Sequence, residues 1–166
     1  MRWLDRLLAR TQSPDLRAIA SLDRAGEVVE IEGRIEALGL LEDPLSGTPA
    51  VLIHYRARVP GVSQRYFGVP DAREVAEVVR SVEFVLRDDS GVARIVVEGE
   101  GTRDLVALHR ELHEQFGVAL LAESELLEPG DRVRVRGRVR SLGEAGSPHR
   151  REPDDAVVLA DGFELI

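Results

Sequence analysis

The chain contains no cysteine and no lysine among its 166 residues. Without cysteine there can be no disulfide bond, no thiolate metal ligand and no cysteine nucleophile. Without lysine there can be no Schiff-base chemistry and no phosphate-binding lysine of the P-loop type. All 22 basic residues are therefore arginines.

Aromatic residues and long apolar runs are also scarce. Phe, Trp and Tyr together make up 4% of the chain, which leaves few rings to stack on nucleic-acid bases. No apolar run approaches the roughly 20 residues of a membrane-spanning helix, and no signal peptide is evident. The net charge of −8 disfavours general nucleic-acid binding, because affinity for phosphates comes from positive charge. We therefore expect a soluble, cytoplasmic protein.

Two segments, residues 27–38 (EVVEIEGRIEAL) and 131–142 (DRVRVRGRVRSL), share one pattern. Each alternates apolar and charged residues, which predicts a β-strand with one buried face. A glycine interrupts each buried face, Gly33 in the first and Gly137 in the second. Such glycines predict a sharp coil or bulge where a small barrel closes.

The outward faces of these two predicted strands carry opposite charges. The first presents glutamates and the second presents arginines. If the strands are neighbours, pairs of opposite charge across the ladder would stabilise them and fix their register. The pairing that we expect joins Glu30, Glu32 and Glu36 to Arg132, Arg134, Arg136 and Arg138.

Further elements follow from the same signals. Strands are predicted at residues 50–59, 82–87, 92–97 and 156–166, and Asp88-Asp89-Ser90-Gly91 is a hairpin turn that explains its aspartates. An amphipathic helix is predicted from Thr102 to Phe116, ending at Gly117. Residues 60–80 are compatible with a short helix or an extended segment. Residues 118–128 are interpreted as a helical or irregular connector.

The first 25 residues predict an N-terminal helical segment. Its first part carries Trp3, Leu4, Leu7 and Leu8 at helical spacing. Ser13 and Pro14 then have the pattern of an N-cap and first helical residue, starting a second helix that reaches about Ala25. We expect the first helix to dock on the barrel or on another copy of the chain. The alternative is a weak peripheral contact with a membrane surface.

Together these elements predict a mainly β protein with minor α. The expected architecture is an OB-like, partly open antiparallel barrel of about six strands, with one helix before the fifth strand. The length fits one globular domain, here residues 26–166, preceded by the segment 1–25.

The histidines and acids form no recognisable catalytic set. His109 and His113 lie four residues apart on the predicted helix, a spacing that can hold zinc, but HRELH is not the HExxH motif and no third ligand is evident. His54 is expected to be a solvated strand residue. No Ser–His–acid order or phosphate loop is present. We therefore expect no catalytic residue, no cofactor and no metal site.

The order of several motifs resembles the GIDE-type or BAM ("beside a membrane") domain, found next to the RING of mitochondrial membrane-anchored ubiquitin ligases and in prokaryotic proteins. The resembling features are Gly33, the segment Pro44 to Pro49 before the apolar strand with Tyr55, residues 84–91 (FVLRDDSG), and Pro129-Gly130-Asp131 before Gly137.

The chain also departs from that family. Asp43 and Ala50 stand where the family often has serine and cysteine, and the chain holds no RING and no transmembrane helix. Ligase activity is therefore not implied. The resemblance implies a β-rich, OB-like interaction or sensing domain, whose prokaryotic relatives look like components of multi-protein systems.

The leading hypothesis is a non-catalytic interaction, scaffold or sensing module that contacts another protein or another copy of itself. Its candidate contact residues are Trp3, Leu4, Leu7, Leu8, Pro44, Leu45, Gly47, Pro49 and Tyr55. The alternative is a single-stranded nucleic-acid binder, because same-face residues about 6.6 Å apart suit a phosphate backbone. Its residues would be Arg132, Arg134, Arg136, Arg138 and Arg140. The acidity of the chain, the matched glutamate strand and the scarcity of aromatic residues make this alternative less favoured. An enzyme is ranked last, because no catalytic set is recognised.

Overall fold

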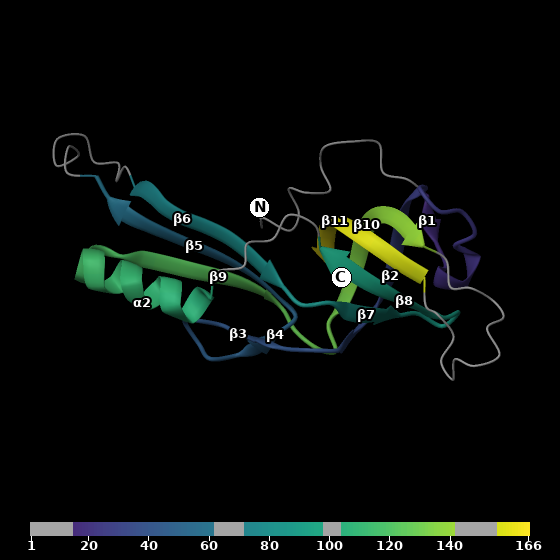
Figure 1. The fold of residues 1–166 in the computed structure, drawn as a ribbon, viewed down its shortest axis with the longest axis horizontal. Helices are drawn as coiled ribbons and strands as arrows, with labels where there is room; N and C mark the ends of the chain where they lie inside the picture. Colours follow the sequence, from purple (N-terminus) through teal and green to yellow (C-terminus); the bar gives the residue numbers. More distant parts are fainter. Residues whose placement is uncertain (1–14, 62–71, 98–103, 142–155) are drawn as a thin grey trace. The chain divides into compact units, whose positions relative to one another are not determined.

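The computed structural model describes residues 15–61, 72–97, 104–141 and 156–166 (Figure 1). These residues are mainly β-strand with one α-helix, and they divide into two compact units. Of the described residues, the barrel unit contains 15–39, 82–97, 128–141 and 156–166, and the sheet unit contains 40–61, 72–81 and 104–127. The chain therefore leaves the barrel unit twice and returns twice.

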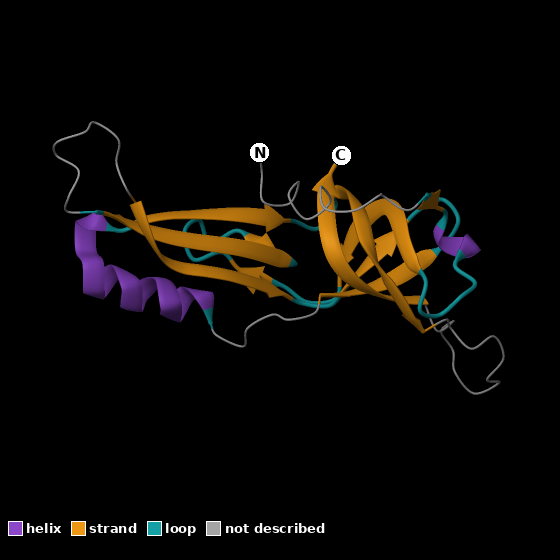
Figure 2. Ribbon diagram, turned by 90° about the horizontal axis from the view of Figure 1, so that it is seen from above, coloured by secondary structure: helices purple, strands orange, loops and turns teal. Residues whose placement is uncertain are grey.

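The barrel unit is a closed five-stranded β-barrel (Figure 2). Its strands are β2 (Val28–Ala37), β7 (Phe84–Arg87), β8 (Val92–Val97), β10 (Arg132–Ser141) and β11 (Ala156–Leu165). They lie in the order β2-β10-β11-β8-β7, and β7 pairs back onto β2. All neighbours are antiparallel except β8 and β11, which are parallel.

The barrel is closed, whereas the sequence led us to expect a partly open one. Closure depends on β2, which is long enough to have a partner on each side. Residues 28–34 of β2 pair with β10, and residues 34–37 pair with β7. No separate strand is then needed to bridge β10 and β7.

Gly33 and Gly137 lie where the barrel strands approach most closely. A Cβ atom on Gly33 would lie 2.5 Å from the carbonyl oxygen of Arg87, and one on Gly137 would lie 2.3 Å from that of Leu159. Gly33 directly precedes the residue at which β2 begins to pair with β7, and Gly137 lies at a register shift against β11. The predicted irregularity is confirmed at Gly137, whereas at Gly33 the ladder to β10 continues without a register shift and the glycine allows the close approach of β7.

The barrel core follows the predicted alternation. Phe84 and Phe163 meet inside it with ring centroids 6.3 Å apart. The other buried side chains come from every strand: Val29, Ile31, Ile35, Leu86, Ala93, Ile95, Val133, Val135, Val139, Val158 and Ala160.

The β7–β8 turn holds the N-terminal part of the described chain. Asp88 Oδ1 accepts hydrogen bonds from the backbone N–H groups of Ser90 (2.7 Å) and Gly91 (2.8 Å), and Oδ2 accepts one from that of Ile19 (2.8 Å). Burial raises the pKa of Asp88, but these hydrogen bonds outweigh it and hold the pKa below its ordinary value. The turn thus uses its first aspartate structurally, as the sequence predicted.

Residues 15–25 are not the helix that the sequence predicted. Leu16–Arg17 form a short strand, β1, parallel to β2, and Ile19–Ser21 form a 3₁₀ turn, η1. Leu16 and Arg17 lie opposite Glu30 and Ile31 in the ladder. The backbone N–H groups of Ile19 and Ala20 donate to the side chains of Asp88 and Ser90, so all these partners are distant in sequence. Residues 1–14, which include the stripe Trp3, Leu4, Leu7 and Leu8, lie outside the described residues.

The sheet unit combines a three-stranded antiparallel sheet with a helix. The sheet has the order β6 (Ala72–Ser81), β5 (Leu52–Pro60), β9 (Leu121–Leu127), and β3 (Leu41–Glu42) pairs with β4 (Pro49–Ala50) as a short ribbon. Helix α2 (Leu105–Phe116) runs along one face of the sheet and leads through η3 (Gly117–Ala119) into β9 (Figure 1).

One apolar cluster joins the helix to the sheet. Leu105, Leu108 and Leu112 on α2 pack against Ile53 and Tyr55 on β5. The helix begins with Asp104 as its N-cap, which accepts a hydrogen bond from the Ala107 N–H at 3.0 Å. It ends at Gly117, whose φ of 58° favours glycine. The predicted end is therefore confirmed, whereas the predicted first residue, Thr102, lies outside the described chain.

Two predictions about the sheet unit are corrected by the structure, and one alternative that the sequence left open is decided. The strand predicted at residues 50–59 does not join the barrel, and forms β5 at the centre of a separate sheet. The segment 60–80 is extended at β6, and the predicted connector 118–128 contains β9. Both edges of β5 offer a ladder of hydrogen bonds, so the valines of β6 take the extended conformation that β-branched residues favour.

Candidate functional site

The turn between β3 and β4 is fixed by its own hydrogen bonds. The backbone N–H of Asp43 donates to the Thr48 carbonyl at 3.0 Å, and that of Gly47 donates to the Asp43 carbonyl at 2.9 Å. The buried carboxylate of Asp43 accepts hydrogen bonds from the Ser46 backbone N–H at 2.8 Å and the Ser46 hydroxyl at 2.7 Å. The φ of Gly47 is 72°, a conformation that side chains disfavour. The turn is therefore held in one shape before any partner binds.

This fixed turn presents apolar side chains to solvent. Leu45 is 41% exposed, and Leu40, just before β3, is 54% exposed. Pro49 and Gly47 are also exposed, whereas Pro44 is half-buried. Exposed leucines on a rigid turn lose little conformational entropy on binding, which favours a contact surface.

A hollow of about 440 Å³ lies beside this turn. Its apolar wall includes Leu40, Leu41 and Ile53, with Leu105 and Val106 from the first turn of α2. Glu42, Arg80 and Asp104 add polar groups. A wall that combines apolar and charged side chains suits a partner side chain whose neighbours form hydrogen bonds.

Tyr55 is not part of that surface, although the sequence placed it there. Its side chain is 0% exposed, and its hydroxyl forms a 2.9 Å hydrogen bond with Nδ1 of His109. The two rings meet edge-to-face with centroids 5.8 Å apart. Burial raises the pKa of Tyr55. The alternating pattern correctly placed Tyr55 on the same face of β5 as Ile53, but α2 covers that face.

The predicted histidine pair lies on α2. His109 and His113 stack with ring centroids 6.3 Å apart, and Nδ1 of His109 is already engaged by Tyr55. Within the described ranges, no three His, Cys, Asp or Glu side chains are grouped to hold a metal ion.

His54 is buried, contrary to the prediction of a solvated residue. It is 1% exposed, and its Nε2 lies 2.9 Å from Oε1 of Glu77 on β6. Burial lowers the pKa of His54, and the hydrogen bond and charge of Glu77 only partly oppose this effect. Alternation alone could not show that both faces of β5 are covered at this position.

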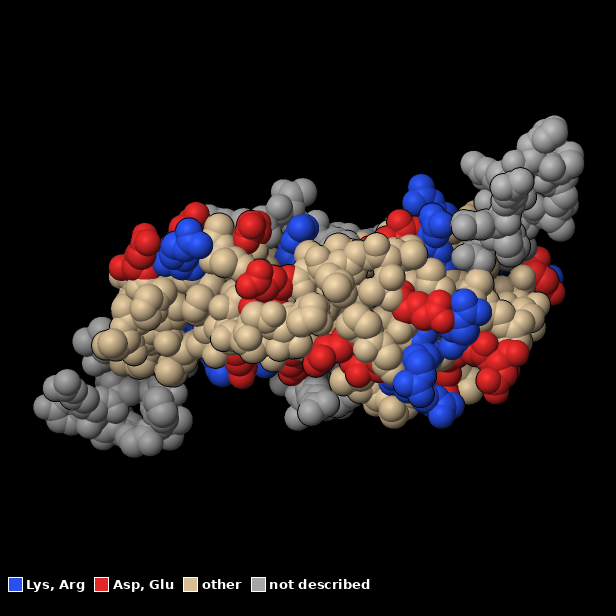
Figure 3. Space-filling model, turned by 90° about the horizontal axis from the view of Figure 1, so that it is seen from below, with Lys and Arg blue, Asp and Glu red and all other residues tan. Residues whose placement is uncertain are grey.

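Arg134, in the arginine strand β10, is neutralised by neighbouring carboxylates. Arg134 lies directly opposite Glu32, as predicted, and donates to it at 2.7 Å. It also lies 3.0 Å from Glu164 and 3.4 Å from Glu30. The hydrogen bond to Glu32 raises the pKa of Arg134 above its ordinary value. Figure 3 shows blue and red side chains next to one another on one face of the barrel unit.

The other arginines of β10 are engaged more loosely. Arg132 lies 3.8 Å from Glu32, Arg136 lies 4.0 Å from Asp161, and Arg138 donates to the Gly26 carbonyl at 2.6 Å. Arg140 is exposed.

The expectation that Glu36 and Arg138 each have an oppositely charged partner in the β2–β10 ladder is wrong. Glu36 extends past the end of β10 and pairs with Arg87 on β7, while Arg138 lies opposite Val28.

The described residues thus define a closed β-barrel joined in sequence to a helix-covered sheet that carries a fixed apolar turn. A scan against protein-family models and a search of curated proteins found no match to the chain. Along the described chain, no helix combines the length and apolar character needed to cross a membrane.

Sequence reasoning located Leu45 and Pro49 at this site but missed Leu40 and the first turn of α2. The position of Leu40, directly after Gly39 and before the loop at Pro44, was the available signal that it could be exposed. Nothing local placed α2 beside it, because more than 60 residues separate Leu40 from Leu105 along the chain.

Proposed function

We propose that this chain is a non-catalytic interaction module that binds another protein through the β3–β4 turn. The observation that carries the proposal is the exposure of two leucines at this hairpin: Leu45 on the turn fixed by Asp43, and Leu40 before β3, in the wall of the hollow. Exposed apolar groups that cluster at a hollow mark sites of protein contact. A partner side chain would enter the hollow, and polar groups beside it would meet the charged part of its wall.

The barrel unit is proposed to be OB-like. Its support is the five-stranded closure and the pairing of its first strand, β2, with β10, the first barrel strand after helix α2. OB-like barrels commonly serve as platforms for binding. The motif order that resembles a GIDE or BAM domain supports the same function, as a scaffold or sensing component of a multi-protein prokaryotic system in the cytoplasm.

Single-stranded nucleic-acid binding along β10 is not favoured by the geometry. A phosphate track needs arginines whose charge is available, and Arg134 is surrounded by Glu30, Glu32 and Glu164. A phosphate strand would also be repelled by those carboxylates.

The proposal is tested by affinity capture from native cells with quantitative mass spectrometry. The double variant Leu40→Ser/Leu45→Ser is compared with Leu121→Ser, a control of equal exposure to Leu40 (54%) in the same unit. We expect the double variant to lose at least tenfold of a partner that Leu121→Ser and the wild type retain. Light scattering of the purified chain shows whether that partner is a second copy. Retention of the same proteins by all three chains would contradict the proposal.

A further inference from the structure

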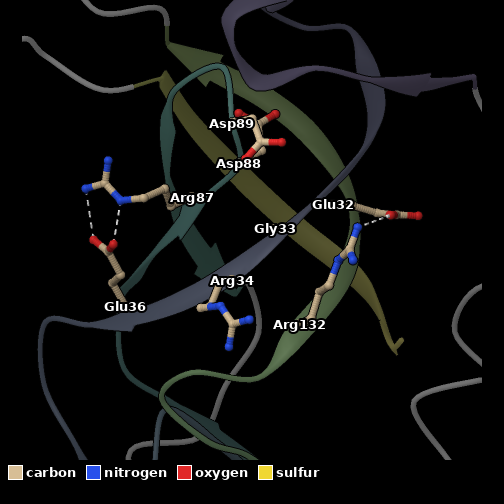
Figure 4. A pocket seen from close by; sticks show the side chains of 8 residues that line it. All are labelled: Glu32, Gly33, Arg34, Glu36, Arg87, Asp88, Asp89 and Arg132. Atoms are coloured by element: carbon tan, nitrogen blue, oxygen red, sulfur yellow. Dashed lines mark hydrogen bonds and ion pairs between the residues drawn. The ribbon is translucent and has the colours of Figure 1, made fainter.

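A second hollow, of about 350 Å³, lies on the barrel unit (Figure 4). Seven of its eight lining residues are charged, three of them arginines and four carboxylates, and the eighth is Gly33. A wall of this kind selects ligands by charge rather than by apolar burial. Which of these charges are already neutralised within the barrel therefore decides what the hollow can bind.

The three arginines form one row across three strands. Arg132 on β10 and Arg87 on β7 each lie directly opposite Arg34 on β2. Like charges in this arrangement are unfavourable unless they are neutralised. Arg87 forms a two-point ion pair with Glu36, and Arg132 lies 3.8 Å from Glu32.

Arg34, in the middle of the row, is not neutralised in this way. Its guanidinium donates one hydrogen bond to the Gly130 carbonyl at 2.6 Å. No carboxylate of the described residues lies within ion-pair distance of it. Because a guanidinium carries five N–H donors, Arg34 can still bind an acidic group at two points.

Among the acidic residues of the hollow, Asp89 is the one whose charge is not neutralised by a described residue. Glu32 and Glu36 are held by arginines, and both oxygens of Asp88 accept backbone hydrogen bonds. Asp89 is exposed and has no hydrogen bond or ion pair with any other described residue. Figure 4 shows Asp89 and Arg34 on either side of Gly33, neither of them joined to another side chain. The hollow thus offers one available charge of each sign.

We infer that this hollow binds a mixed-charge segment of a partner protein, with an acidic side chain at Arg34 and a basic side chain at Asp89. The inference rests on the proposed function and adds a second, electrostatic contact to it. A polyanion such as single-stranded DNA satisfies only Arg34 and meets Asp89, Asp88 and Glu36 as like charges. The volume, near the lower end for ligand pockets, suits two side chains rather than a larger group.

The test uses the full chain and three labelled peptides of equal length, built from Glu-Gly-Arg, Glu-Gly-Gly and Arg-Gly-Gly repeats, with an oligothymidylate as a fourth probe. Fluorescence anisotropy measures binding at low and physiological salt. We expect the mixed-charge peptide to bind at least fivefold more tightly than each other probe. Arg34→Ala and Asp89→Ala should each weaken its binding at least fivefold.

Two further variants distinguish binding at this hollow from a general effect of charge. Arg94→Ala removes an exposed arginine of β8 that pairs with Glu83 at 3.3 Å, and should change binding less than twofold. The charge exchange Arg34→Asp/Asp89→Arg keeps one charge of each sign and should restore most of the binding lost in Arg34→Asp. Circular dichroism confirms that each variant is folded.

Equal binding by the wild type and Arg34→Ala, or binding of the oligothymidylate as tight as that of the mixed-charge peptide, would overturn the inference. If no peptide binds while partner capture through Leu40 and Leu45 persists, this site is wrong and the proposed function stands. If the peptide binds as expected but capture does not depend on those leucines, the β3–β4 contact is wrong instead.

Discussion

Gly33 and Gly137 show how single residues without side chains permit the barrel to close. At each position the space for a Cβ atom is taken by a carbonyl oxygen of the neighbouring strand, at 2.5 Å and 2.3 Å. These are backbone atoms, so they cannot move aside as a flexible side chain can. A methyl group at either position must therefore displace a strand.

We predict that Gly33→Ala destabilises the protein by at least about 2 kcal/mol, because overpacking against backbone forces strands apart. Gly39→Ala is the matched control, since its Cβ would lie 3.8 Å from the nearest atom. The control should change stability by no more than about 0.5 kcal/mol. Urea unfolding followed by circular dichroism gives both values. Equal midpoints for the two variants would show that the barrel accommodates the methyl group.

His54 is the buried titratable group whose pKa bears on stability near neutral pH. Its folded-state pKa lies below the ordinary value of 6.5 because burial disfavours the charged imidazolium. As pH falls below about 6.5, the unfolded chain therefore binds a proton that the folded chain does not. Stability contributed by neutral His54 is present above this pH and is lost progressively below it.

We predict that the wild type loses unfolding free energy between pH 7.5 and pH 5.5, and that His54→Gln loses less over the same range. The comparison concerns the slope, because His54→Gln also alters the contact with Glu77 at every pH. Urea midpoints at several pH values measure the two slopes. Identical slopes for wild type and His54→Gln would assign the pH dependence to other groups.

At the scale of elements, β2 and β10 are matched by charge as well as by shape. Their inward residues fill the barrel, and their outward residues place Glu32 opposite Arg134 and Glu30 opposite Arg136. A slip of one residue would move the apolar face outward and break these pairs. Glu30 is only 5% exposed although it faces outward, so this ion-pair cluster is partly removed from water.

We predict that Arg134→Glu costs about 1–2 kcal/mol, because it places like charges among Glu30, Glu32 and Glu164. Adding Glu32→Arg should recover part of that loss. Arg140→Glu, on an exposed position of the same strand, should cost less than about 0.5 kcal/mol. Unfolding in urea at low and high salt provides the values. A phosphate-binding role would be indicated instead if Arg134→Glu left stability unchanged and abolished oligonucleotide binding.

At the scale of the whole molecule, the chain builds two cores from interleaved segments. The barrel core gathers around Phe84 and Phe163, and the sheet unit gathers around Tyr55 and the leucines of α2. The sheet unit is supplied by two separate insertions into the barrel sequence, residues 40–81 and 100–127. Each insertion alone would leave its apolar face without a partner.

We predict that a cavity in one core mainly affects its own unit. Leu108→Ala, in the sheet unit, should accelerate amide exchange of β5, β6 and β9, and Leu86→Ala that of the barrel strands. Each substitution should cost about 2–5 kcal/mol of local stability. Hydrogen exchange with mass spectrometry resolves the segments. Equal acceleration in both units for either variant would show that they unfold as one cooperative body.

Part of the candidate sites could be predicted because the signal is local. Leu45 and Pro49 lie in a turn marked by prolines and glycine, and the hairpin at Asp88 to Gly91 carries its own turn residues. The charged hollow could not be predicted, since Arg34, Arg87 and Arg132 come from three distant segments. Their alignment depends on strand register, which the sequence specified for β2 and β10 but not for β7.

The sequence by itself determined the alternating strands, the irregularity at Gly137, the charge match between β2 and β10, and the end of helix α2. Each follows from residues close together or from complementary patterns. Only the tertiary structure decided that β5 leaves the barrel, that β6 and β9 are extended, and that residues 15–25 are not helical. The physical reason is that strands take their hydrogen-bond partners from distant segments, and that burial, as at His54 and Tyr55, depends on what covers each face.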